Sequence, residues 1–386
     1  MTRRRIVVVD QYFPPDTSAT ARIVADFADA CAHAGAPLTI VCGHPSYDPS
    51  ARIGWRPMRR VRADGRTRIV VGSTGFDRRS ALGRVLNYVT FMVGAACVVP
   101  FVSARAAVVV MTDPPMAPLL AWWARRVGRP ASVGVWMQDL HPDFGVAAGL
   151  LRNGLLVRLW RGALRRALRV CDDVFVLGRD MASRVDALGV SVATRVVHNG
   201  WSGVVAAAPR GAPSTPVRVM HFGNLGFAGP WESVISAARE LEGVAEFVFV
   251  GGGAGEAVFA DAPSNVKVLP RVPHEEVSRM AADADLLLVG VRAGLEGYVV
   301  PSKGYEMMAL GRPPLVVADA ACEIRRIVAE HACGFAVDDR PDAVAQAVRS
   351  ACELDLHDMT ARALAAAPQY TRSVQFATLV ARLSPA

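Results

Sequence analysis

The sequence DLLLVGVRAGLEGYVVPSKGYEMMALGRPPLVV, residues 285–317, contains two short apolar runs with a loop and a helical pattern between them. Residues 285–290 and 313–317 have the length and composition of buried strands. Pro301 can open a helix between them, because a proline in the first helical position loses no intrahelical hydrogen bond. This order of strand, crossover helix and strand predicts two parallel strands in a sheet that helices cover.

The same alternation extends outward over the whole chain. In the first half the expected strands are 5–10, 37–42, 67–72, 106–112, 131–137, 173–177 and 194–198. In the second half they are 217–222, 246–250, 265–269, 285–290, 313–317 and 335–337. Because 386 residues are too many for one ordinary core, the sequence predicts an α/β fold of two Rossmann-like, doubly wound parallel-sheet domains that face each other across a cleft.

Proline, alanine and glycine mark the expected domain boundary. Segment 206–216 is rich in these residues and predicts a linker between a first domain, residues 1–205, and a second domain, residues 217–370. The last segment, residues 371–386, is expected to form a helix that returns to the first domain.

The composition, 52% hydrophobic and 20% charged, is that of a globular protein with large aliphatic cores. Seven scattered cysteines without a C-x-x-C pair argue against a disulfide framework and against a zinc site. They favour a reducing, cytoplasmic location. The basic start is followed by only four apolar residues before Asp10, so Ile6 to Val9 is interpreted as a buried strand and not as a secretory leader.

Charge is distributed unevenly along the chain. Residues 1–210 contain 28 Arg and 14 acidic residues, a balance of +14, whereas the rest contains 15 basic and 21 acidic residues, a balance of −6. Nucleic acid is not expected as a partner, because aromatic and basic residues do not interleave as stacking surfaces require. The basic first half favours peripheral contact with an anionic membrane, at the inner face of the plasma membrane.

One uncharged segment has the length of a membrane span. Residues 85–104 contain no charged side chain, but a span here would place the strands before and after it on opposite sides of a bilayer. A crossover helix that is buried or grazes a membrane is therefore the preferred interpretation, with spanning as the alternative. Residues 158–169 alternate Arg with Leu and Trp at helical spacing, which suits a membrane interface or a solvated helix face.

Ligands of open parallel sheets bind beyond the carboxyl ends of the strands, so the loops that follow strands supply the candidate site. Polar and glycine-rich residues follow strands of both halves, including Asp139 and His141 in the first and Gly223, Asn224 and Arg292 in the second. The triple glycine 251–253 is only partly like a dinucleotide fingerprint; Gly252 and Gly253 suit any close backbone approach to a phosphate. Asp283 and Asp285 mimic a metal-binding D-x-D motif, but a structural role is favoured because a strand follows directly.

The start of the helix near residue 301 is the most informative position. Ser302 and Lys303 fall in its first turn, where free amides and an ammonium group together suit a diphosphate. Glu306 follows one turn later and suits a hydrogen bond to ribose hydroxyls. A capped surface helix with incidental charges is the structural alternative.

At these residues the chain resembles the family 4 glycosyltransferases of the GT-B superfamily, particularly the bacterial branch that builds surface polysaccharides and glycolipids. The motifs that carry the resemblance are Gln11–Pro15, Gln138–Pro142, Gly223–Gly226, Val300–Lys303 and Tyr305–Glu306. The resemblance implies transfer from a nucleoside-diphosphate sugar, with retention at the anomeric carbon, without a metal ion or another cofactor. It also implies that the second lobe holds the nucleotide, through Glu306 at the ribose and Arg271 and Val272 at the base, and that the first lobe holds the acceptor.

The chain departs from the family pattern at several positions. The glutamate often found eight residues before Glu306 is Tyr298, and Glu296 is displaced from it by two positions. The usual Arg and Lys that clamp the diphosphate fall on Asn224 and Gly229, so Arg292 and Lys303 are the expected substitutes. The glycine pair of the first loop is replaced around Ser18 and Ala19, and the expected catalytic-lobe histidine is Gln138.

These observations give a set of candidate roles. We expect Arg292 and Lys303 to stabilise the departing diphosphate, and Asp139, with His141 beside it, to orient the sugar or the acceptor hydroxyl. The donor site is expected to comprise Gly223, Asn224, Gly252, Gly253, Arg271, Val272, Ser302, Lys303 and Glu306. A UDP-linked sugar is the favoured donor, and the acceptor is a glycan, a lipid-linked sugar or a small molecule. A sugar-nucleotide epimerase and a catalytically degenerate binding partner are the alternative functions.

Overall fold

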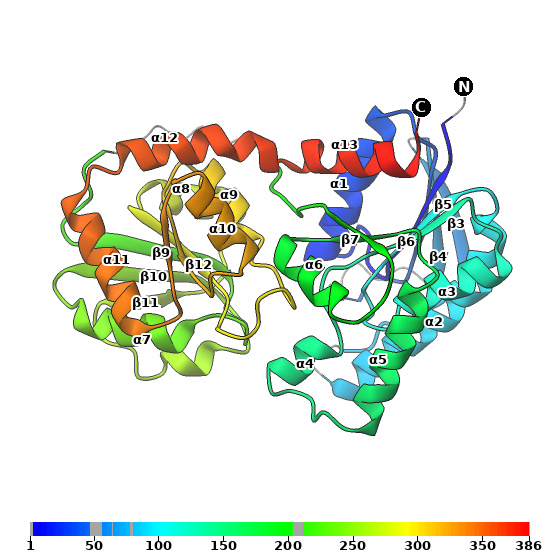
Figure 1. Ribbon diagram of the computed structural model, residues 1–386, viewed down its shortest axis with the longest axis horizontal. Coiled ribbons are helices and arrows are strands. Elements are labelled where there is room, and N and C mark those ends of the chain that lie inside the picture. The colour runs from blue at the N-terminus through cyan, green and yellow to red at the C-terminus, as the bar shows by residue number, and fades with distance from the viewer. Residues whose placement is uncertain (1–2, 47–55, 64, 78–79, 204–210, 386) are drawn as a thin grey trace.

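The computed structural model describes residues 3–46, 56–63, 65–77, 80–203 and 211–385, which form two lobes (Figure 1). The predicted linker falls partly outside the described residues, at positions 206–210. Each lobe is built on its own sheet, and helices cover both faces. The first lobe contains the strands β1 (Ile6–Val9), β2 (Leu38–Cys42), β3 (Met58–Ala63), β4 (Arg66–Val71), β5 (Ala107–Met111), β6 (Ser132–Trp136), β7 (Asp173–Val176) and β8 (Ala193–Val196).

The sheet of the first lobe has the order β3-β4-β2-β1-β5-β6-β7-β8. All neighbouring pairs are parallel except β3 and β4, which pair antiparallel at the edge. β1 lies at the centre, and its four residues are fully buried, as expected for a parallel strand that is covered on both faces.

Six helices lie between these strands: α1 (Ala19–His33), α2 (Ala81–Ser103), α3 (Pro118–Val127), α4 (Asp143–Ala147), α5 (Leu155–Leu168) and α6 (Arg179–Asp186). Right-handed crossovers that run in opposite directions along a sheet fall on opposite faces. The crossover through α1 leads from β1 outward to β2, whereas α2, α3 and α5 lead toward β5, β6 and β7. Therefore α1 covers one face and α2, α3 and α5 lie beside one another on the other.

Every strand expected from the sequence is present, but the edge strand β3 was missed. Its sequence, MRRVRA, has no apolar alternation, and most of its side chains are exposed. A strand that buries neither face has no periodic hydrophobic pattern. β3 is therefore recognised only from its antiparallel pairing with β4, which begins with Met58 opposite Val71.

The second lobe repeats the architecture with six parallel strands in the order β11-β10-β9-β12-β13-β14. Their bounds are β9 (Val217–Asn224), β10 (Ala245–Gly252), β11 (Val266–Leu269), β12 (Leu286–Gly290), β13 (Pro314–Val317) and β14 (Phe335–Val337). The helices are α7 (Trp231–Glu240), the 3-10 turn η2 (Glu256–Phe259), α8 (His274–Ala282), α9 (Lys303–Ala309), α10 (Glu323–Glu330), α11 (Pro341–Glu353), α12 (His357–Ala366) and the 3-10 turn η3 (Ala367–Tyr370).

Asp285 has a structural role at the start of β12. Its buried carboxylate accepts hydrogen bonds from the main-chain N–H of Ser214 at 3.1 Å and of Arg218 at 2.8 Å. The carboxylate therefore fixes the segment that leads into β9, in agreement with the non-metal interpretation of the D-x-D sequence.

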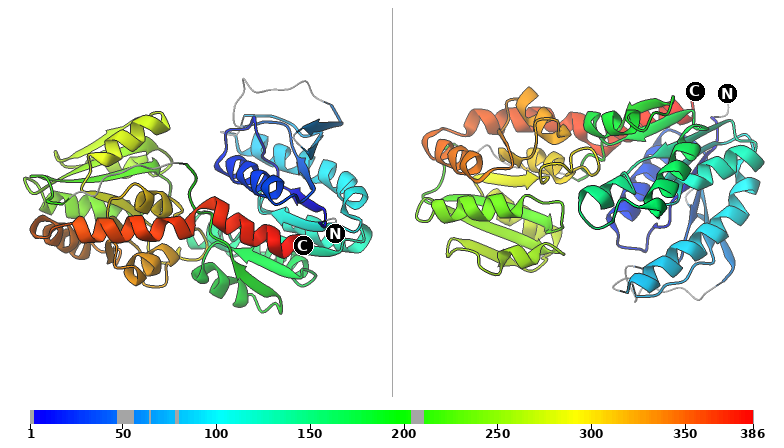
Figure 2. Two further views of the ribbon diagram at one scale, coloured as in Figure 1. Left: turned by 90° about the horizontal axis from the view of Figure 1, so that it is seen from above. Right: turned by 60° about the horizontal axis from the view of Figure 1, so that its bottom comes forward.

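The chain crosses between the lobes twice, and the two crossings touch. The main chain of Trp201 accepts a hydrogen bond from Arg372 N at 2.8 Å and donates one to Tyr370 O at 3.0 Å. Beyond this point the last helix, α13 (Arg372–Leu383), packs on α1 of the first lobe, so that α12 and α13 together run along both lobes (Figures 1 and 2). Phe376 meets Phe27 and Trp136 edge to face at centroid distances of 6.0 and 5.2 Å, within the first lobe's core.

Helix α2 contains the uncharged segment considered as a membrane span. Among the described residues it is the one helix long and apolar enough to cross a membrane, by length and composition only. The strands before it, β1, β2 and β4, share one sheet with β5, which follows it. α2 therefore lies along this sheet as a crossover helix, with only 22% of its most apolar window buried.

Candidate functional site

Two cavities lie between the lobes, and Lys303 lines both of them. The larger, of about 740 Å³, is here called the basic cavity; Arg22 lines it from the first lobe, and Arg271 and His274 from the second. The smaller, of about 480 Å³, is here called the central cavity; Asp139 lines it from the first lobe and Ser302 from the second. Lys303 thus separates a positively charged space from one that contains a carboxyl group.

The side chain of Lys303 is held at the start of α9. Its Nζ lies 2.7 Å from Glu306 Oε2 and 5.1 Å from the centre of the Phe222 ring. Glu306 Oε1 lies 3.5 Å from Nδ1 of His274, so two basic groups flank this carboxylate. With 43% of its side chain exposed, Lys303 remains accessible from the cavities while Glu306 fixes its direction.

The helix behind Lys303 begins slightly later than the sequence suggested. α9 starts at Lys303 with Ser302 at its N-cap, rather than at Pro301. Pro301 and Ser302 already turn the chain, because Gly304 N donates to Pro301 O at 3.2 Å and Tyr305 N donates to Ser302 O at 3.3 Å. Pro301, Ser302 and Lys303 all line the central cavity, so this turn faces the opposite lobe and not bulk solvent.

The glycine-rich loops after β9 and β10 pack against each other beside the cavities. Gly251 has φ of +152°, and a Cβ there would lie 1.8 Å from Gly223 O, so no larger residue fits this approach. Gly223 lines the basic cavity and Asn224 lines both cavities. Gly252 and Gly253 line neither: Gly252 O accepts from Leu225 N at 3.2 Å, and Gly253 N donates to Glu256 Oε1 at 2.6 Å. They support the loop that carries Asn224.

Position 229, where the family carries a diphosphate-binding lysine, cannot hold a long side chain in this structure. A Cβ on Gly229 would lie 2.0 Å from the Trp231 ring, whose Nε1 donates to Gly226 O at 2.8 Å. Arg292 does not replace the positive charge that is missing at position 229, because it lines neither cavity. Its main-chain N–H donates a hydrogen bond to Ala228 O at 2.7 Å.

Arg22 supplies a cation that the sequence analysis did not identify. It lies in the first turns of α1 and, with Thr17, Ser18 and Ala19, lines the basic cavity opposite Arg271 and Val272. The sequence offered one indication that a helix begins here, because Ser18 is a favourable N-cap residue; its side chain accepts a hydrogen bond from Ala21 N at 3.0 Å. This loop of the first lobe therefore adds positive charge where the family's glycine pair is missing.

Asp139 lies at the carboxyl edge of the first sheet and lines the central cavity. Burial, and then the neighbouring carboxylate of Asp113, raise the pKa of Asp139 to about 7. Its main-chain N–H donates to Thr112 Oγ1 at 3.3 Å, which ties the β6 loop to the β5 loop. Near neutral pH this carboxyl group can therefore exchange a proton.

Asp10, like Asp139, lies close to the carboxylate of Asp113, and it was not selected from the sequence as a site residue. It is fully buried; burial, and then Asp113, raise its pKa well above the usual value for aspartate. One carboxylate oxygen accepts from Tyr12 N at 3.0 Å, and the other has no hydrogen-bond partner in the described structure. Asp10 directly follows β1 and Asp113 lies two residues beyond β5, and this position at strand ends was the available signal in the sequence.

His141 is placed differently from Asp139. Its ring stacks on Trp160 of α5 at 6.1 Å and meets Phe144 edge to face at 5.6 Å, and it lines neither cavity. Burial lowers the pKa of His141 to about 4, so the ring is neutral near pH 7. In this structure His141 packs the loop behind Asp139.

His221, inside strand β9, is a second polar residue that sequence analysis missed. It lines the central cavity; its Nδ1 lies 3.0 Å from Leu288 O, and its Nε2 has no hydrogen-bond partner among the described residues. Burial lowers the pKa of His221 to about 4. A neutral ring that donates from Nδ1 presents Nε2 as an acceptor, which suits a hydroxyl group in the cavity.

The loop before Lys303 is attached to the opposite lobe. Leu140 N donates to Tyr298 O at 2.9 Å, and the guanidinium of Arg184 lies 4.4 Å from the centre of the Tyr298 ring. Glu296 does not face the cavities; its carboxylate accepts from Gly294 N at 3.0 Å within its own loop. Tyr298 thus joins the Asp139 loop to the Lys303 loop, at the position where the family often has a glutamate.

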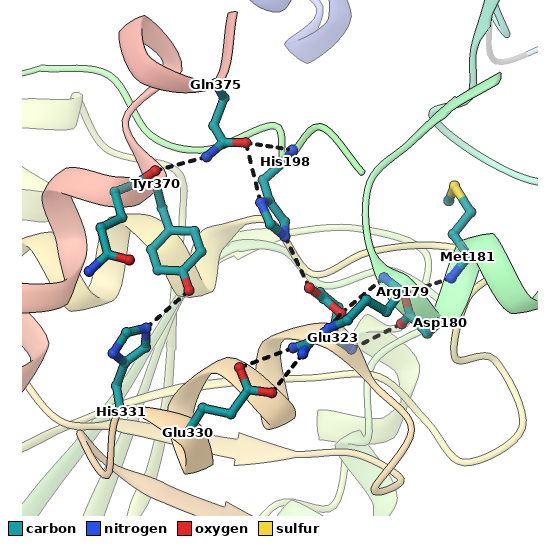
Figure 3. Close-up of polar contacts among 10 residues, drawn as sticks. Arg179, Asp180, Met181, His198, Glu323, Glu330, His331, Tyr370 and Gln375 are labelled. Atoms are coloured by element: carbon teal, nitrogen blue, oxygen red, sulfur yellow. Dashed lines mark hydrogen bonds and ion pairs between the residues drawn. The ribbon is translucent and has the colours of Figure 1, made fainter. Parts of the chain in front are cut away.

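A buried carboxylate also connects the two lobes (Figure 3). Glu323 of α10 is 2% exposed, and its Oε2 accepts from Nε of Arg179 at 2.8 Å and from its main-chain N at 3.0 Å. Glu323 Oε1 lies 3.0 Å from Nε2 of His198. Burial opposes the charged carboxylate, but the hydrogen bonds from His198 and Arg179 outweigh it and lower the pKa of Glu323.

Three further contacts extend this connection (Figure 3). Asp180 Oδ2 accepts from Glu323 N at 3.1 Å, and Arg179 Nη1 lies 2.6 Å from Glu330 Oε1. Gln375 of α13 accepts from His198 N at 3.2 Å. Helices of both lobes therefore meet in one polar network beside the two chain crossings.

The described residues form no group of three or more His, Cys, Asp or Glu side chains that could hold a metal ion. All seven cysteines lie in the described part of the chain and carry free thiols.

Comparison with known families identifies both lobes. Residues 18–200 match the family described as glycosyl transferase 4-like domain, and residues 209–368 match the family described as glycosyl transferases group 1. The probable glycosyltransferase WbjE of Pseudomonas aeruginosa is 28% identical over 241 residues, which are 58% of this chain and 60% of that protein. The putative colanic acid biosynthesis glycosyl transferase WcaI of Escherichia coli is 26% identical over 250 residues, covering 58% and 61%. The chain thus spans about three fifths of the length of these relatives.

Solved structures show the same fold over nearly the full length. Sucrose-phosphate synthase from Thermosynechococcus elongatus superposes with a TM-score of 0.71 at 13% identity, covering 99% of both chains. HepE from Anabaena, solved in complex with UDP, superposes with a TM-score of 0.64 at 16% identity, covering 98% of both chains. The two matched halves, the two parallel sheets and the sequence relatives together show that the chain belongs to the family 4 glycosyltransferases of the GT-B superfamily.

Proposed function

We propose that the chain transfers a sugar from a nucleoside-diphosphate donor to an acceptor, with retention at the anomeric carbon. The observation that supports this most strongly is the position of Lys303, which lines both the basic cavity and the central cavity between the lobes. An ammonium group at this boundary would lie beside the bond that joins a diphosphate to its sugar.

The basic cavity suits the nucleotide part of the donor. Arg22, Arg271 and Lys303 provide three cations from two lobes. Charge-assisted hydrogen bonds from such groups stabilise a diphosphate by about 1.5–3 kcal/mol each. Glu306 lies outside the cavity lining, bound to Lys303 and next to His274, and we propose that it turns toward the ribose hydroxyls when the donor binds. We propose UDP as the nucleotide, by analogy with HepE, whose structure contains UDP. No metal ion or other cofactor is part of this proposal.

The central cavity suits the sugar and the attacking hydroxyl. His221 offers an unpaired nitrogen to a sugar hydroxyl, and Asp139 on the opposite lobe can orient the acceptor hydroxyl. In a front-face transfer the C1–O bond to the acceptor forms as the C1–O bond to the phosphate breaks, and the acceptor's proton passes to the leaving phosphate oxygen. The positive groups around Lys303 stabilise the charge that develops on that oxygen.

The biological setting follows from the relatives. Because WcaI is named for colanic acid biosynthesis, we propose that this chain acts in the assembly of a polysaccharide or glycoconjugate. Its free thiols favour a reducing, cytoplasmic location. The acceptor is a glycan, a lipid-linked sugar or a small molecule.

A catalytically degenerate binding protein is a second candidate function, because Asn224 and Gly229 carry no charge where the family binds the diphosphate. Incubation of the protein with a panel of nucleotide sugars, with and without candidate acceptors, separates the possibilities. Transfer predicts a rise in melting temperature with one donor and acceptor-dependent release of its nucleoside diphosphate. Donor binding without turnover would support the degenerate alternative, and conversion of the sugar without any acceptor would support an epimerase.

A further inference from the structure

Helix α2 exposes an apolar face that no described part of the chain covers. Its buried residues repeat every four positions from Gly83 to Ser103 and face the sheet. The opposite side carries large apolar side chains that are 38% to 85% exposed: Leu82, Val85, Leu86, Val89, Val93 and Phe101. Arg84 is the one charged residue of this helix. A monomeric protein in water gains nothing from this arrangement.

A second group of exposed leucines lies at the start of α5 and in the segment before it. Leu150, Leu151, Leu155, Leu156 and Leu159 are 39% to 82% exposed. Figure 1 shows α2, α3 and α5 on the same side of the first lobe, and α3 contacts both of the others. We refer to the exposed apolar residues of α2 and of Leu150–Leu159 together as the apolar ridge.

The ridge reaches the mouth of the central cavity. Crossover helices run antiparallel to the strands that they connect, so the first turns of α2 and α5 lie at the carboxyl edge of the sheet, where the cavity opens. Leu150 is 53% exposed and also lines the central cavity together with Phe144. The exposed apolar surface is therefore continuous with the wall of the cavity that contains Asp139.

Positive charge accompanies the ridge. Residues 144–171 contain six arginines and no acidic residue. Arg152, Arg158, Arg166 and Arg169 are exposed, and the guanidiniums of Arg126 and Arg166 lie 5.7 and 5.4 Å from the Trp122 ring of α3. Exposed leucines next to arginines and a half-buried tryptophan are the pattern of a surface that lies on an anionic bilayer.

We propose that the first lobe docks on an anionic phospholipid bilayer through the apolar ridge, with the mouth of the central cavity facing the lipid surface. An acceptor with a lipid tail can then reach Asp139 along Leu150 without leaving the bilayer. The docking itself does not depend on the proposed transfer reaction, whereas the lipid-tailed acceptor does. A soluble partner protein that covered the ridge would give the chain no preference for anionic lipid.

The test is sedimentation of the full chain with vesicles of phosphatidylcholine that contain about one quarter phosphatidylglycerol. We expect binding that weakens on pure phosphatidylcholine and at high salt. The double variants Leu155→Asp/Leu156→Asp and Val89→Asp/Val93→Asp should each reduce the bound fraction by about tenfold. Leu354→Asp, at a 42% exposed leucine of the second lobe, should bind as the unaltered chain does.

A thermal shift with UDP, recorded for each variant, shows whether the fold and the proposed nucleotide site are intact and separates failure of the docking proposal from failure of the proposed function. Vesicle binding that both ridge variants retain would overturn the docking proposal. So would sedimentation velocity in the absence of lipid if it showed a dimer that both ridge variants abolish, because a second copy of the chain would then cover the ridge.

Discussion

In the second lobe, Arg271, Val272 and Lys303 line one cavity and Glu306 holds Lys303 beside it, and all four were selected from the sequence. In the first lobe, Asp139 lines a cavity but the neighbouring His141 packs against Trp160 instead. In the second lobe these residues come as two short clusters, Arg271 and Val272 directly before α8 and Lys303 and Glu306 in the first turn of α9. The first lobe builds its site from the ends of β1, β5 and β6, which are far apart in sequence. Site residues that are close together in the sequence form a recognisable motif. Site residues from separate strand ends appear in the sequence only as isolated polar residues.

The largest effect should follow from removing the cation at the boundary of the two cavities. Lys303→Ala is expected to lower kcat/KM by about 10²–10³, the loss typical for one preorganised group that stabilises developing negative charge. The chain has one other lysine, Lys267, which lies on the edge strand β11, 3.7 Å from Glu246. Lys267→Ala should change the rate less than about twofold. Equal losses in both variants, measured as nucleoside diphosphate release, would remove Lys303 from the mechanism.

The carboxyl group of the opposite lobe should have the next largest effect. Asp139→Asn is expected to lower turnover by about 10²-fold, and the unaltered enzyme should gain activity as the pH rises through about 7, where Asp139 loses its proton. A rate that is flat between pH 5 and 8 would contradict this role.

The same substitution should affect stability in a pH-dependent way. Because the pKa of Asp139 is raised in the folded state, the folded chain holds a proton that the unfolded chain has released, and this stabilisation is lost as the pH rises through about 7. The change in melting temperature that Asp139→Asn causes should therefore be more positive at pH 8 than at pH 5. Asp186→Asn, on the exposed surface of α6, is the control and should show no such difference.

The polar network between the lobes allows a stability test that is independent of activity. Glu323→Ala leaves Arg179 and His198 without their shared carboxylate and should cost about 1–3 kcal/mol of unfolding free energy, less than a fully buried pair because Arg179 is 42% exposed. The half-exposed Glu330→Ala should cost less than about 0.5 kcal/mol.

The stability that Glu323 contributes should depend on pH. The lowered pKa of Glu323 means that its contribution is present above the usual glutamate range and is lost as the pH falls through the folded-state value. Urea unfolding at pH 7 and at acidic pH measures both quantities. A Glu323→Ala variant as stable as Glu330→Ala at pH 7 would show that the network does not hold the lobes together.

The smallest effect concerns the contact between the two loops. Tyr298→Ala removes the ring beneath Arg184, a contact of about 0.5–2 kcal/mol, and should lower kcat by about three- to tenfold while the affinity for UDP stays unchanged. Tyr298→Phe keeps the ring and the main-chain bond to Leu140 and should restore the rate. If Tyr298→Ala weakened UDP binding as much as it slowed turnover, Tyr298 would act on the donor and not between the lobes.

Strand periodicity explains why so much of the fold could be predicted. The central parallel strands are apolar runs that end in polar or glycine-rich loops, as at Ile6–Val9 and Leu286–Gly290. The exposed strand β3 lacks that pattern and was missed. The predicted crossover role of the segment in α2 is confirmed, because the strands on both sides of it share one sheet.

The site was harder to predict, because its missing members depend on how loops meet in space. Arg22 lies one turn into α1 and enters the basic cavity only because the lobes face each other. His221 lies within an apolar strand, so the sequence gives no sign that it faces a cavity. That Nε2 is the nitrogen without a partner follows only from the structure, in which Nδ1 bonds to Leu288 O. Conversely, the charge of Arg292 suggested a role, but its side chain lies outside the cavity linings.

The central claim is that a nucleotide diphosphate lodges between the lobes against Lys303. Because the chain has only two lysines, reaction with an amine-selective acylating reagent, followed by peptide mass spectrometry, reports on that contact directly. Saturating UDP or UDP-sugar should slow the labelling of Lys303 strongly and leave that of Lys267 unchanged. Labelling of Lys303 at the same rate with and without a nucleotide that raises the melting temperature would show that the diphosphate binds elsewhere.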